Sequence, residues 1–205
     1  MKKLLLETIR CENGRLQNLE WHQERAERSC RDVFGAKSEI SLSSISIPQP
    51  VREAKGVFKC RVIYDTRIQK TEFTLYSIRP VRSLMVTTAD AIKYNHKFAD
   101  RAHIQAMFEK RGPADDILMA VNGLATDTSY ANIALFDGTQ WLTPARPLLP
   151  GTRRAALLLK GILRPADIPV HSLSEFREIR LINAMMGLEE GPVVLPEGLI
   201  FSFHG

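Results

Sequence analysis

Three hairpin-type dipeptides set the strongest limit on what this chain can fold into. Asn13-Gly14, Asn122-Gly123 and Asp137-Gly138 each stand at or between short apolar runs. Asn-Gly and Asp-Gly readily adopt the positive backbone φ angles that a two-residue connection between antiparallel strands requires. The sequence therefore predicts antiparallel hairpins, and a doubly wound parallel sheet is disfavoured.

Helical patterns lie between these hairpins. Residues 20–35 (EWHQERAERSCRDVFG) carry an apolar stripe and end at Gly35, a residue common just after a helix. A helix is expected after Gly151, and Phe98, His103 and Met107 are spaced for one face of another. The apolar face expected for the helix after Gly151 includes Ala156, Leu159, Ile162 and Leu163.

Alternating apolar residues predict strands on both sides of these helices. The expected strands are 4–9, 16–19, 57–65, 71–78 and 83–88, a strand before the Asn122-Gly123 turn in 115–127, a hairpin over 131–144 and a last strand followed by a loop in 178–194. Serine and proline in residues 41–50 (SLSSISIPQP) indicate a loop. Hairpins combined with helices predict an α+β (mixed α/β) fold in two lobes.

A proline interrupts the strand pattern at residues 77–83 (SIRPVRS) and indicates a linker between domains. The chain of 205 residues can form one large domain or two small ones. We predict a small α/β lobe at residues 1–82 and a larger lobe at residues 83–205.

Composition indicates an ordinary globular protein, with 44% hydrophobic and 25% charged residues. The net charge of +5 suits anionic partners such as phosphorylated small molecules or nucleic acid. The cations are scattered, and no block of like charge resembles a nucleic-acid-binding arm, although a basic binding module stays an alternative. The odd number of cysteines (three), without metal-ligand spacing, predicts structural thiols in a reducing cytoplasm.

The sequence carries few signals for membranes or metals. The apolar part of the opening segment is only Leu4-Leu5-Leu6, which is too short for a secretory signal, and we expect a first strand there. No run approaches the roughly 20 apolar residues of a membrane span. The five histidines show no spacing typical of metal ligands, so no metal is expected. Walker, GxGxxG and GxSxG motifs are absent.

A helix start after Pro150-Gly151 is a candidate anion site. Gly151 allows the backbone to approach an anion closely, and the N–H groups of Thr152 and Arg153 would be the donors of the first turn. The positive end of the helix dipole and the two adjacent arginines add to the attraction. The alternative is a Pro-Gly loop before an ordinary helix.

Two further residues complete a possible chemical set. Lys97 stands where a β-rich run gives way to a helix-like run, and Asp127 lies in a polar turn between strands. Each also has an ordinary interpretation, as a surface lysine and as a turn residue. An amine, an acid and an anion cradle, in this order, are what a pyridoxal-phosphate enzyme requires.

Together these segments resemble the class IV aminotransferase family, the fold type IV pyridoxal-phosphate enzymes. The resemblance spans nearly the whole chain and implies a two-lobed enzyme whose larger lobe is built on a β-rich, barrel-like sheet. It also implies an N-terminally shortened member, because the family usually has more residues before the "FET-R" strand. The matching segments are LETIR, LEWHQERAERS, HKFADR, NGLATDTSYANIALF, LTPARPLLPGTRRA and RLINAMMG.

The resemblance implies a role for each matching residue. Lys97 is the implied Schiff-base lysine and proton shuttle; its rival Lys93 lacks the context that Asp100 and Arg101 give Lys97. Asp127 takes the place of the family's glutamate at the pyridine nitrogen. The implied phosphate ligands are Arg25, Gly151, Thr152, Arg153, Asn183 and Ala184.

HKFADR and NAMM resemble the "KHLNR" and "NALM" segments of aminodeoxychorismate lyase more than their branched-chain counterparts. This implies a cytoplasmic homodimer that eliminates pyruvate from a chorismate-derived substrate to give 4-aminobenzoate for folate biosynthesis. The alternatives are a class IV aminotransferase of branched-chain or D-amino acids and a catalytically degenerate pyridoxal-phosphate-binding protein. Arg153 replaces the threonine of "LPGITR", and Ala102 stands where branched-chain enzymes have tyrosine. The resemblance implies no nucleic-acid or membrane partner.

Overall fold

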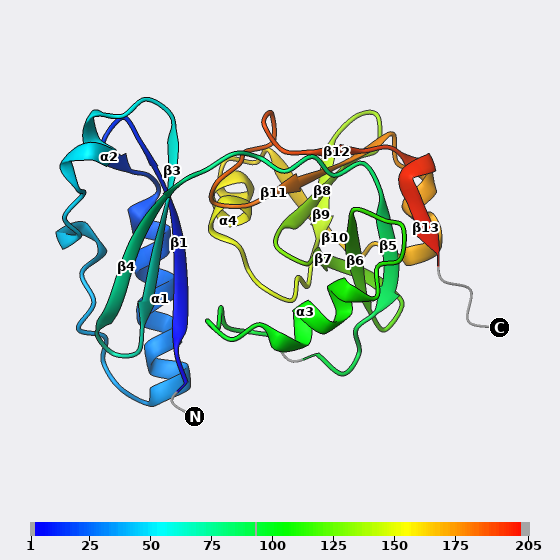
Figure 1. The fold of residues 1–205 in the computed structure, drawn as a ribbon. Coiled ribbons are helices and arrows are strands. Elements are labelled where there is room, and N and C mark those ends of the chain that lie inside the picture. Colours follow the sequence, from blue (N-terminus) through cyan, green and yellow to red (C-terminus); the bar gives the residue numbers. More distant parts are fainter. Residues whose placement is uncertain (1–2, 93, 202–205) are drawn as a thin grey trace. The chain divides into compact units, whose positions relative to one another are not determined.

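The computed structural model describes residues 3–92 and 94–201 (Figure 1). The chain forms two compact units, each described by itself below. The first unit comprises Met1–Ser77 and His96–Asp100, and the second comprises Ile78–Asn95 and Arg101–Gly205. The predicted lobes and these units differ in the placement of residues 78–82 and 96–100.

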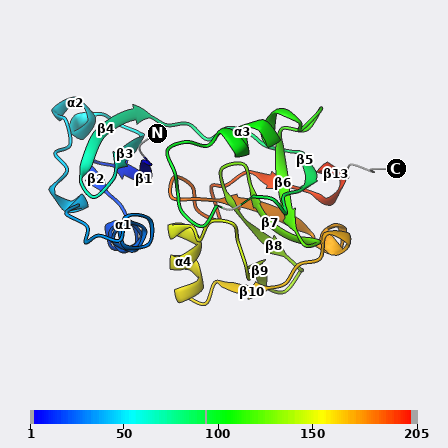
Figure 2. The same cartoon turned by 90° about the horizontal axis from the view of Figure 1, so that it is seen from below.

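The first unit is an antiparallel sheet with one long helix against it (Figures 1 and 2). The strand order is β2-β1-β3-β4. The strands are β1 (Leu5–Glu12), β2 (Arg15–Leu16), β3 (Val57–Tyr64) and β4 (Ile68–Leu75), and the helices are α1 (Leu19–Phe34), η1 (Leu42–Ser44) and α2 (Gln49–Glu53).

Local signals explain the connections at the start of this unit. Asn13 and Gly14 have φ angles of 50° and 66°, as the hairpin between β1 and β2 requires, which confirms the predicted turn. Gly35 ends α1 in the left-handed conformation and donates its N–H to Arg31 O at 2.9 Å. Apolar residues of α1, β1 and β3 form the core of this unit, among them Ile9, Cys30 and Tyr64.

The second unit is built on a branched sheet of nine strands, in the order β10-β9-β8-β7-β6-β5-β13 with β11 and β12 attached through β8. The strands are β5 (Leu84–Thr88), β6 (Asp116–Val121), β7 (Leu124–Thr128), β8 (Asn132–Phe136), β9 (Trp141–Pro144), β10 (Leu163–Ala166), β11 (Glu178–Ile182), β12 (Val193–Val194) and β13 (Leu199–Phe201). The helices are α3 (Ala102–Glu109), α4 (Thr152–Leu159), η2 (Val170–Glu175) and η3 (Pro196–Gly198).

Both parallel and antiparallel pairs occur in this sheet. β5 runs parallel to β6 and β13, and β9 runs parallel to β10, whereas β6–β7, β7–β8, β8–β9 and β8–β11 are antiparallel. The predicted hairpins at Asn122-Gly123 and Asp137-Gly138 are confirmed, because each lies between paired strands. The α+β fold class is likewise confirmed.

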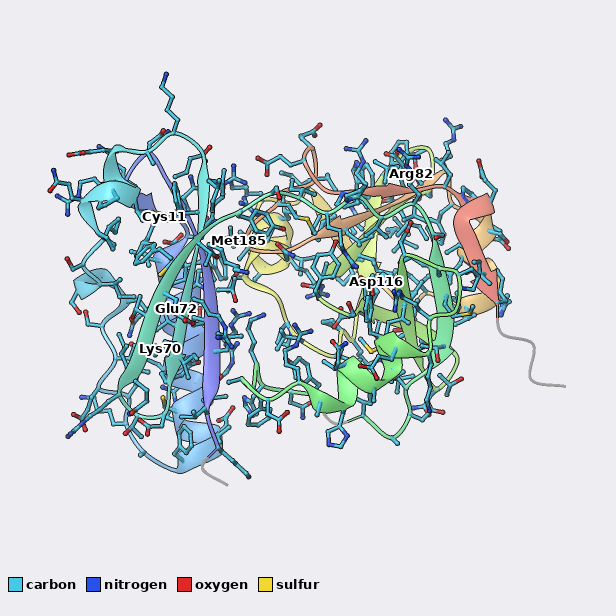
Figure 3. All side chains as sticks on the ribbon, in the orientation of Figure 1. Cys11, Lys70, Glu72, Arg82, Asp116 and Met185 are labelled. Atoms are coloured by element: carbon cyan, nitrogen blue, oxygen red, sulfur yellow. The ribbon has the colours of Figure 1, made fainter. Side chains whose placement is uncertain are left out.

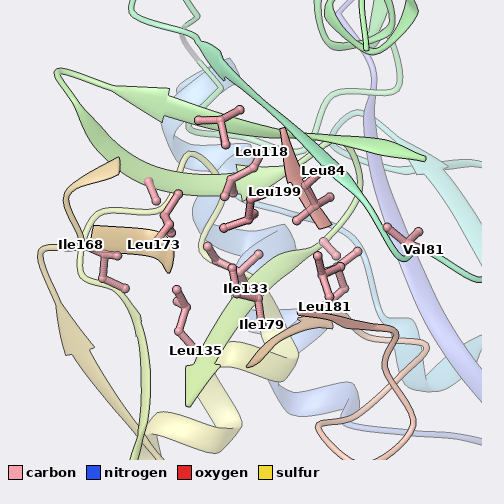
Figure 4. Close-up of a cluster of buried hydrophobic side chains, with 14 of the residues drawn as sticks. Val81, Leu84, Leu118, Ile133, Leu135, Ile168, Leu173, Ile179, Leu181 and Leu199 are labelled. Carbon is pink, nitrogen blue, oxygen red and sulfur yellow. The ribbon is translucent and has the colours of Figure 1, made fainter. Parts of the chain in front are cut away.

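The main core of the second unit lies where the branches of the sheet face each other (Figure 4). Its fully buried members include Leu84, Leu118, Ile133, Leu135 and Leu181, from four different strands. The hydrophobic residues of this core thus connect β8, which pairs with three other strands, to the strands at both ends of the sheet.

Several local predictions were wrong. Residues 96–100 form no helix, and Phe98 makes an isolated bridge with Leu5; helix α3 begins only at Ala102, so Phe98 is not on its face. Helix α4 ends at Leu159, which is 77% exposed, and Leu163 begins β10. The second strand ends at Leu16, and residues 41–50 contain η1 and the start of α2.

Candidate active site

Lys97 lies on an extended segment that pairs with β1. The Leu6 N–H donates to Lys97 O at 2.8 Å, and the Ala99 N–H donates to Leu4 O at 2.9 Å. Phe98 forms an isolated antiparallel bridge with Leu5. Because β2 covers only the last two residues of β1, this segment occupies the part of that edge that β2 leaves open. The Lys97 backbone is therefore fixed by a sheet and does not begin a helix.

A buried carboxylate on β1, Glu7, gathers two side chains of α1. Arg25 donates through Nε to Glu7 Oε1 at 2.8 Å and through Nη2 to Oε2 at 2.5 Å. His22 Nδ1 lies 2.5 Å from the same Oε2. All three side chains are buried, and Glu7 is completely inaccessible. The spacing His22-x-x-Arg25 places both partners on one face of α1, toward β1.

The charges of this cluster fix its protonation states. Burial raises the pKa of Glu7, but the Arg25 charge and the hydrogen bonds from His22 and Arg25 outweigh burial and lower that pKa to about 2. Burial lowers the pKa of His22, against the attraction of Glu7. The positive charges of Arg25 and Lys97 lower the pKa of His22 further. Lys97 therefore acts electrostatically on this cluster, which consists of an ionised Glu7, a neutral His22 and a charged Arg25.

Asp127 lies at the end of β7 in the second unit and is 4% exposed. Its Oδ1 accepts a hydrogen bond from Asn132 Nδ2 at 2.7 Å, and its Oδ2 accepts one from the Leu149 N–H at 2.8 Å. Burial raises the pKa of Asp127 to about 6, although these hydrogen bonds and the Arg154 charge oppose the rise. Asp127 is therefore a carboxyl group that titrates near neutral pH.

The turn at residues 149–152 leads directly into α4. Gly151 precedes the helix, and no side chain caps the helix there. A Cβ atom at Gly151 would lie 2.0 Å from Asn132 Oδ1, so only glycine fits this position without movement of Asn132. Thr152 is buried and Arg153 is half-buried.

Arg154 is the buried arginine of this turn. Its Nη2 donates to Pro144 O at 2.6 Å, and its Nε donates to Thr143 Oγ1 at 3.3 Å. Burial lowers the pKa of Arg154 and the charge of Asp127 raises it. The first turn of α4 thus buries a cation, Arg154, that has hydrogen-bond partners. The sequence pattern had indicated only that the arginines raise the local electrostatic potential.

Asn183 and Ala184 follow β11 in a tight turn. The Asn183 N–H donates to Met186 O at 3.1 Å, and Asn183 Oδ1 accepts the Met185 N–H at 2.8 Å. Asn183 Nδ2 donates to Tyr130 O at 3.4 Å. This turn is therefore attached to the loop that follows Asp127.

The structure distributes the predicted site residues between the two units. Lys97 and Arg25 belong to the first unit, together with the Glu7 and His22 that sequence reasoning missed. Asp127 and the 149–152 turn belong to the second unit and are joined there through Asn132. The rival amine Lys93 lies outside the described residues.

Two signals in the sequence could have found the missed residues. Glu7 stands in phase with Leu5 and Ile9, which are both completely buried, so an alternating strand places a carboxylate toward the core. Asn132 follows Asp127 by five residues, opposite it across the β7–β8 pair.

The residues of each unit fit parts of pyridoxal phosphate. A carboxylate has about four acceptor positions, so Asp127 can accept a further N–H besides those from Asn132 and Leu149. The start of α4 has no side-chain cap, and a helix start of this kind attracts phosphate. The buried Arg25 guanidinium is a suitable phosphate donor. No cluster of metal-ligating side chains occurs among residues 3–92 and 94–201.

Fold and residues define a class of protein: an α+β chain with a lysine on a segment bonded to β1, a buried acid and a glycine turn before a helix. The family model of amino-transferase class IV matches residues 65–189, and the chain belongs to that family. Members are pyridoxal-phosphate-dependent aminotransferases or lyases. No helix in the described part of the chain is long and apolar enough to cross a membrane.

Similar proteins come from several bacteria and from yeast. The chain is 36% identical to an uncharacterized Haemophilus influenzae protein, over 90% of this chain and 98% of that protein. It is 25% identical to the aminodeoxychorismate lyase of Saccharomyces cerevisiae, over 93% of this chain and 59% of that protein, so it spans little more than half of the yeast enzyme.

Solved structures share the fold. A Haemophilus somnus protein proposed to be a 4-amino-4-deoxychorismate lyase has a TM-score of 0.84 and 30% identity, over 92% of this chain and 99% of that chain. A hypothetical aminotransferase of Mycobacterium tuberculosis in a pyridoxal-phosphate-bound form has a TM-score of 0.75 and 17% identity, over 96% and 81%.

Proposed function

We propose that the protein is a pyridoxal-phosphate-dependent lyase that eliminates pyruvate from aminodeoxychorismate and releases 4-aminobenzoate. The observation that carries this proposal is the buried Asp127 carboxylate, held beside the glycine turn that begins α4. The likeness to the Haemophilus somnus protein and to the yeast lyase supports this reaction among those of the family.

The proposed roles follow from the chemistry of each side chain. When bound, pyridoxal phosphate supplies an electron sink for the bond changes at the substrate carbon. The Lys97 Nζ attaches the cofactor and moves the proton at the substrate carbon. Asp127 accepts the N–H of the pyridine ring, and its negative charge holds that nitrogen protonated.

Each unit carries groups suited to a cofactor phosphate. Arg25 binds the cofactor phosphate, and Glu7 orients its guanidinium through two hydrogen bonds. The backbone of Gly151, Thr152 and Arg153 supplies the groups of the second unit, with the turn at Asn183 and Ala184. Dipoles at the start of α4 favour the anion there.

The lysine also needs a defined electrostatic setting. Its backbone is held by β1, so the side chain starts from a fixed position. Because His22 is neutral, it does not add a second positive charge near Lys97 besides that of Arg25.

A direct test supplies aminodeoxychorismate to the purified protein with pyridoxal phosphate and without any keto-acid acceptor. We expect equal amounts of pyruvate and 4-aminobenzoate, and no product from Lys97→Ala. An exposed lysine of the same chain, Lys70, provides the matched control: Lys70→Ala is expected to keep the activity. Absence of both products from the wild-type protein would refute the lyase function.

A class IV aminotransferase is the second candidate, favoured by the shared fold of the Mycobacterium tuberculosis aminotransferase. It predicts amino-group transfer only when a keto acid is added, with glutamate or a branched-chain or D-amino acid as donor. A catalytically degenerate protein would bind pyridoxal phosphate and give neither result.

We further propose a homodimer in the cytoplasm that contributes to folate biosynthesis. Three reduced thiols, Cys11, Cys30 and Cys60, support a reducing compartment. Light scattering at several concentrations measures the subunit number, and 4-aminobenzoate auxotrophy in a strain without the gene tests the pathway.

A further inference from the structure

Asn132 joins the acid and the phosphate turn of the second unit. Its Nδ2 donates to Asp127 Oδ1 at 2.7 Å and to Leu149 O at 2.9 Å. The Leu149 N–H returns a hydrogen bond to Asp127 Oδ2 at 2.8 Å. Three hydrogen bonds therefore close a ring through Asn132, Asp127 and Leu149.

The orientation of the Asn132 amide is determined by its partners. A carboxylate oxygen and a backbone carbonyl both accept hydrogen bonds, so both must face the amide nitrogen. The amide oxygen then faces Gly151, where an added Cβ would lie 2.0 Å from it. The three atoms nearest to that Cβ position all belong to Asn132.

Burial makes this arrangement costly to rearrange. Asn132 is 6% exposed and Asp127 is 4% exposed, so water does not readily replace a lost partner. Gly151 has a φ of −71° and a ψ of 144°, which any residue adopts. The requirement for glycine at this position therefore comes from the Asn132 side chain and not from the backbone conformation.

We propose that Asn132 is a positioning residue that couples the carboxylate of Asp127 to the turn before α4. The proposal rests on the proposed cofactor roles of Asp127 and of that turn. Asn132 and Leu149 hold the carboxylate through one hydrogen bond to each oxygen, which fixes its direction while it can still accept a ring N–H. The distance between the ring-nitrogen partner and the phosphate turn is thereby set by the Asn132 side chain together with the Leu149 N–H.

Gly151 and Asn132 then form a pair whose substitutions interact. Gly151→Ala places a methyl group against the Asn132 oxygen, so either Asn132 or the turn must move. Asn132→Ala removes the atoms that the methyl group meets. The double variant therefore has room for both changes, and the two effects are expected to be strongly non-additive.

The first measurement uses the protein without cofactor. Urea unfolding of wild type, Gly151→Ala, Asn132→Ala and the double variant forms a double-mutant cycle. We expect Gly151→Ala to lower the unfolding midpoint in the wild-type background and to change it little in the Asn132→Ala background. Equal shifts in both backgrounds would overturn the coupling.

The second measurement titrates each variant with pyridoxal phosphate. Each single substitution is expected to raise the dissociation constant by about tenfold or more, as expected for loss of a hydrogen bond to a charged group. Asn132→Ala is also expected to shift the pH dependence of the bound-cofactor absorbance, because Asp127 loses a partner that favours its ionised form. Gln105→Ala, which removes an exposed amide from α3, is expected to change neither quantity.

The outcomes separate this proposal from the proposed function. An Asn132→Ala protein with wild-type affinity and pH dependence would overturn the positioning role while the cofactor role of Asp127 stands. A wild-type protein that binds no pyridoxal phosphate would overturn the proposed function and the positioning role with it. The proposal is supported if the Gly151 and Asn132 substitutions are non-additive in the protein without cofactor and each single substitution weakens the binding of pyridoxal phosphate.

Discussion

Arg25 and Glu7 form a buried ion pair with two parallel hydrogen bonds, at 2.8 Å and 2.5 Å, between α1 and β1. An ion pair taken out of water stabilises a fold only when its partners satisfy each other, and removal of one partner leaves a buried charge. Arg25 therefore depends on Glu7 both for its position and for its presence in the interior.

Glu7→Gln is expected to destabilise the protein by about 3–5 kcal/mol, because the glutamine amide leaves Arg25 as an uncompensated buried charge. It is also expected to weaken pyridoxal-phosphate binding. Urea unfolding and cofactor titration measure the two effects. Glu24→Gln removes a carboxylate from an exposed pair on the same helix and is expected to change stability by less than about 1 kcal/mol. Equal effects of the two substitutions would contradict the role of Glu7.

The Glu7 ion pair also predicts how stability depends on pH. The pKa of Glu7 is about 2 in the folded protein, against 4.5 ordinarily. Its contribution is therefore complete above pH 4.5 and is lost as the pH falls toward 2. The difference in unfolding free energy between wild type and Glu7→Gln should narrow over this range. A difference that stays constant from pH 5 to pH 2.5 would show that Glu7 is not ionised in the fold.

Cofactor binding should follow the ionisation of Asp127. Burial raises the pKa of Asp127 to about 6, and only the ionised carboxylate attracts a protonated ring nitrogen. The affinity for pyridoxal phosphate should fall as the pH decreases below about 6. Asp127→Asn provides the comparison, because the cofactor phosphate titrates in the same range in both proteins. Parallel affinity curves for the two proteins would argue against a charged Asp127.

The raised pKa has the opposite consequence for stability without cofactor. The unfolded chain ionises Asp127 near pH 3.8, whereas the folded chain holds the proton until about pH 6. The folded state binds more protons in this interval, so the contribution of Asp127 to stability falls as the pH rises through it. Unfolding of wild type and Asp127→Asn at pH 4 and pH 7 measures this change. A wild-type protein that gains stability relative to the variant over this interval would contradict it.

Two leucines of the second unit should respond differently to truncation. Leu135 on β8 is completely buried in the main core, whereas Leu159 at the end of α4 is 77% exposed. Leu135→Ala is expected to cost 2–5 kcal/mol, roughly, because it leaves a cavity. Leu159→Ala is expected to cost under about 0.5 kcal/mol. Denaturant unfolding of both variants measures the difference. Similar unfolding midpoints would contradict the burial of Leu135 in the main core.

The three thiols should be unreactive in the folded protein. Cys11, Cys30 and Cys60 are buried, and burial raises the pKa of each, that of Cys60 to about 12. Reactive cysteines require an accessible thiolate. A thiol reagent at pH 8 is expected to label none of them until denaturant is added, and fast labelling of the native protein would contradict this burial.

Sequence patterns correctly predicted the elements whose formation depends on residues close together in the chain. Asn13-Gly14 and Asn122-Gly123 form hairpin turns because their residues accept positive φ angles, and this preference needs no distant partner. Helix α1 was likewise found from its apolar stripe and from Gly35. In contrast, Lys97 pairs with β1, about ninety residues earlier in the chain, and no local pattern encodes that partner.

Buried polar groups explain the other errors. Hydrophobic periodicity assigned the covered face of α4 to apolar residues, whereas the helix buries Thr152 and Arg154. Arg154 is buried because Pro144 O and Thr143 Oγ1 accept its N–H groups. Asp116, which is labelled in Figure 3, is another buried charge. Its carboxylate pairs with Arg79 at 2.6 Å. A pattern of hydrophobic residues cannot detect groups that are buried with their partners.

The types of residue in the candidate site were predicted more completely than the hydrogen bonds that connect them. Lys97 and Asp127 were singled out from their local sequence context and Arg25 from the resemblance, and their roles remain predictions. Glu7 and Asn132 were not singled out, because each matters through a residue that the fold brings to it. Partners of this kind become visible only when side-chain positions are known.

The segment that carries Lys97 has a consequence for any attempt to divide the molecule. Residues 96–100 complete the first unit, although residues 78–95 before them belong to the second. A single cut in the chain therefore cannot release either unit intact, and a fragment that stops at Ser77 lacks the segment that carries Lys97. During synthesis, the edge of β1 at Leu5 cannot pair with residues 96–100 until the ribosome has passed residue 100.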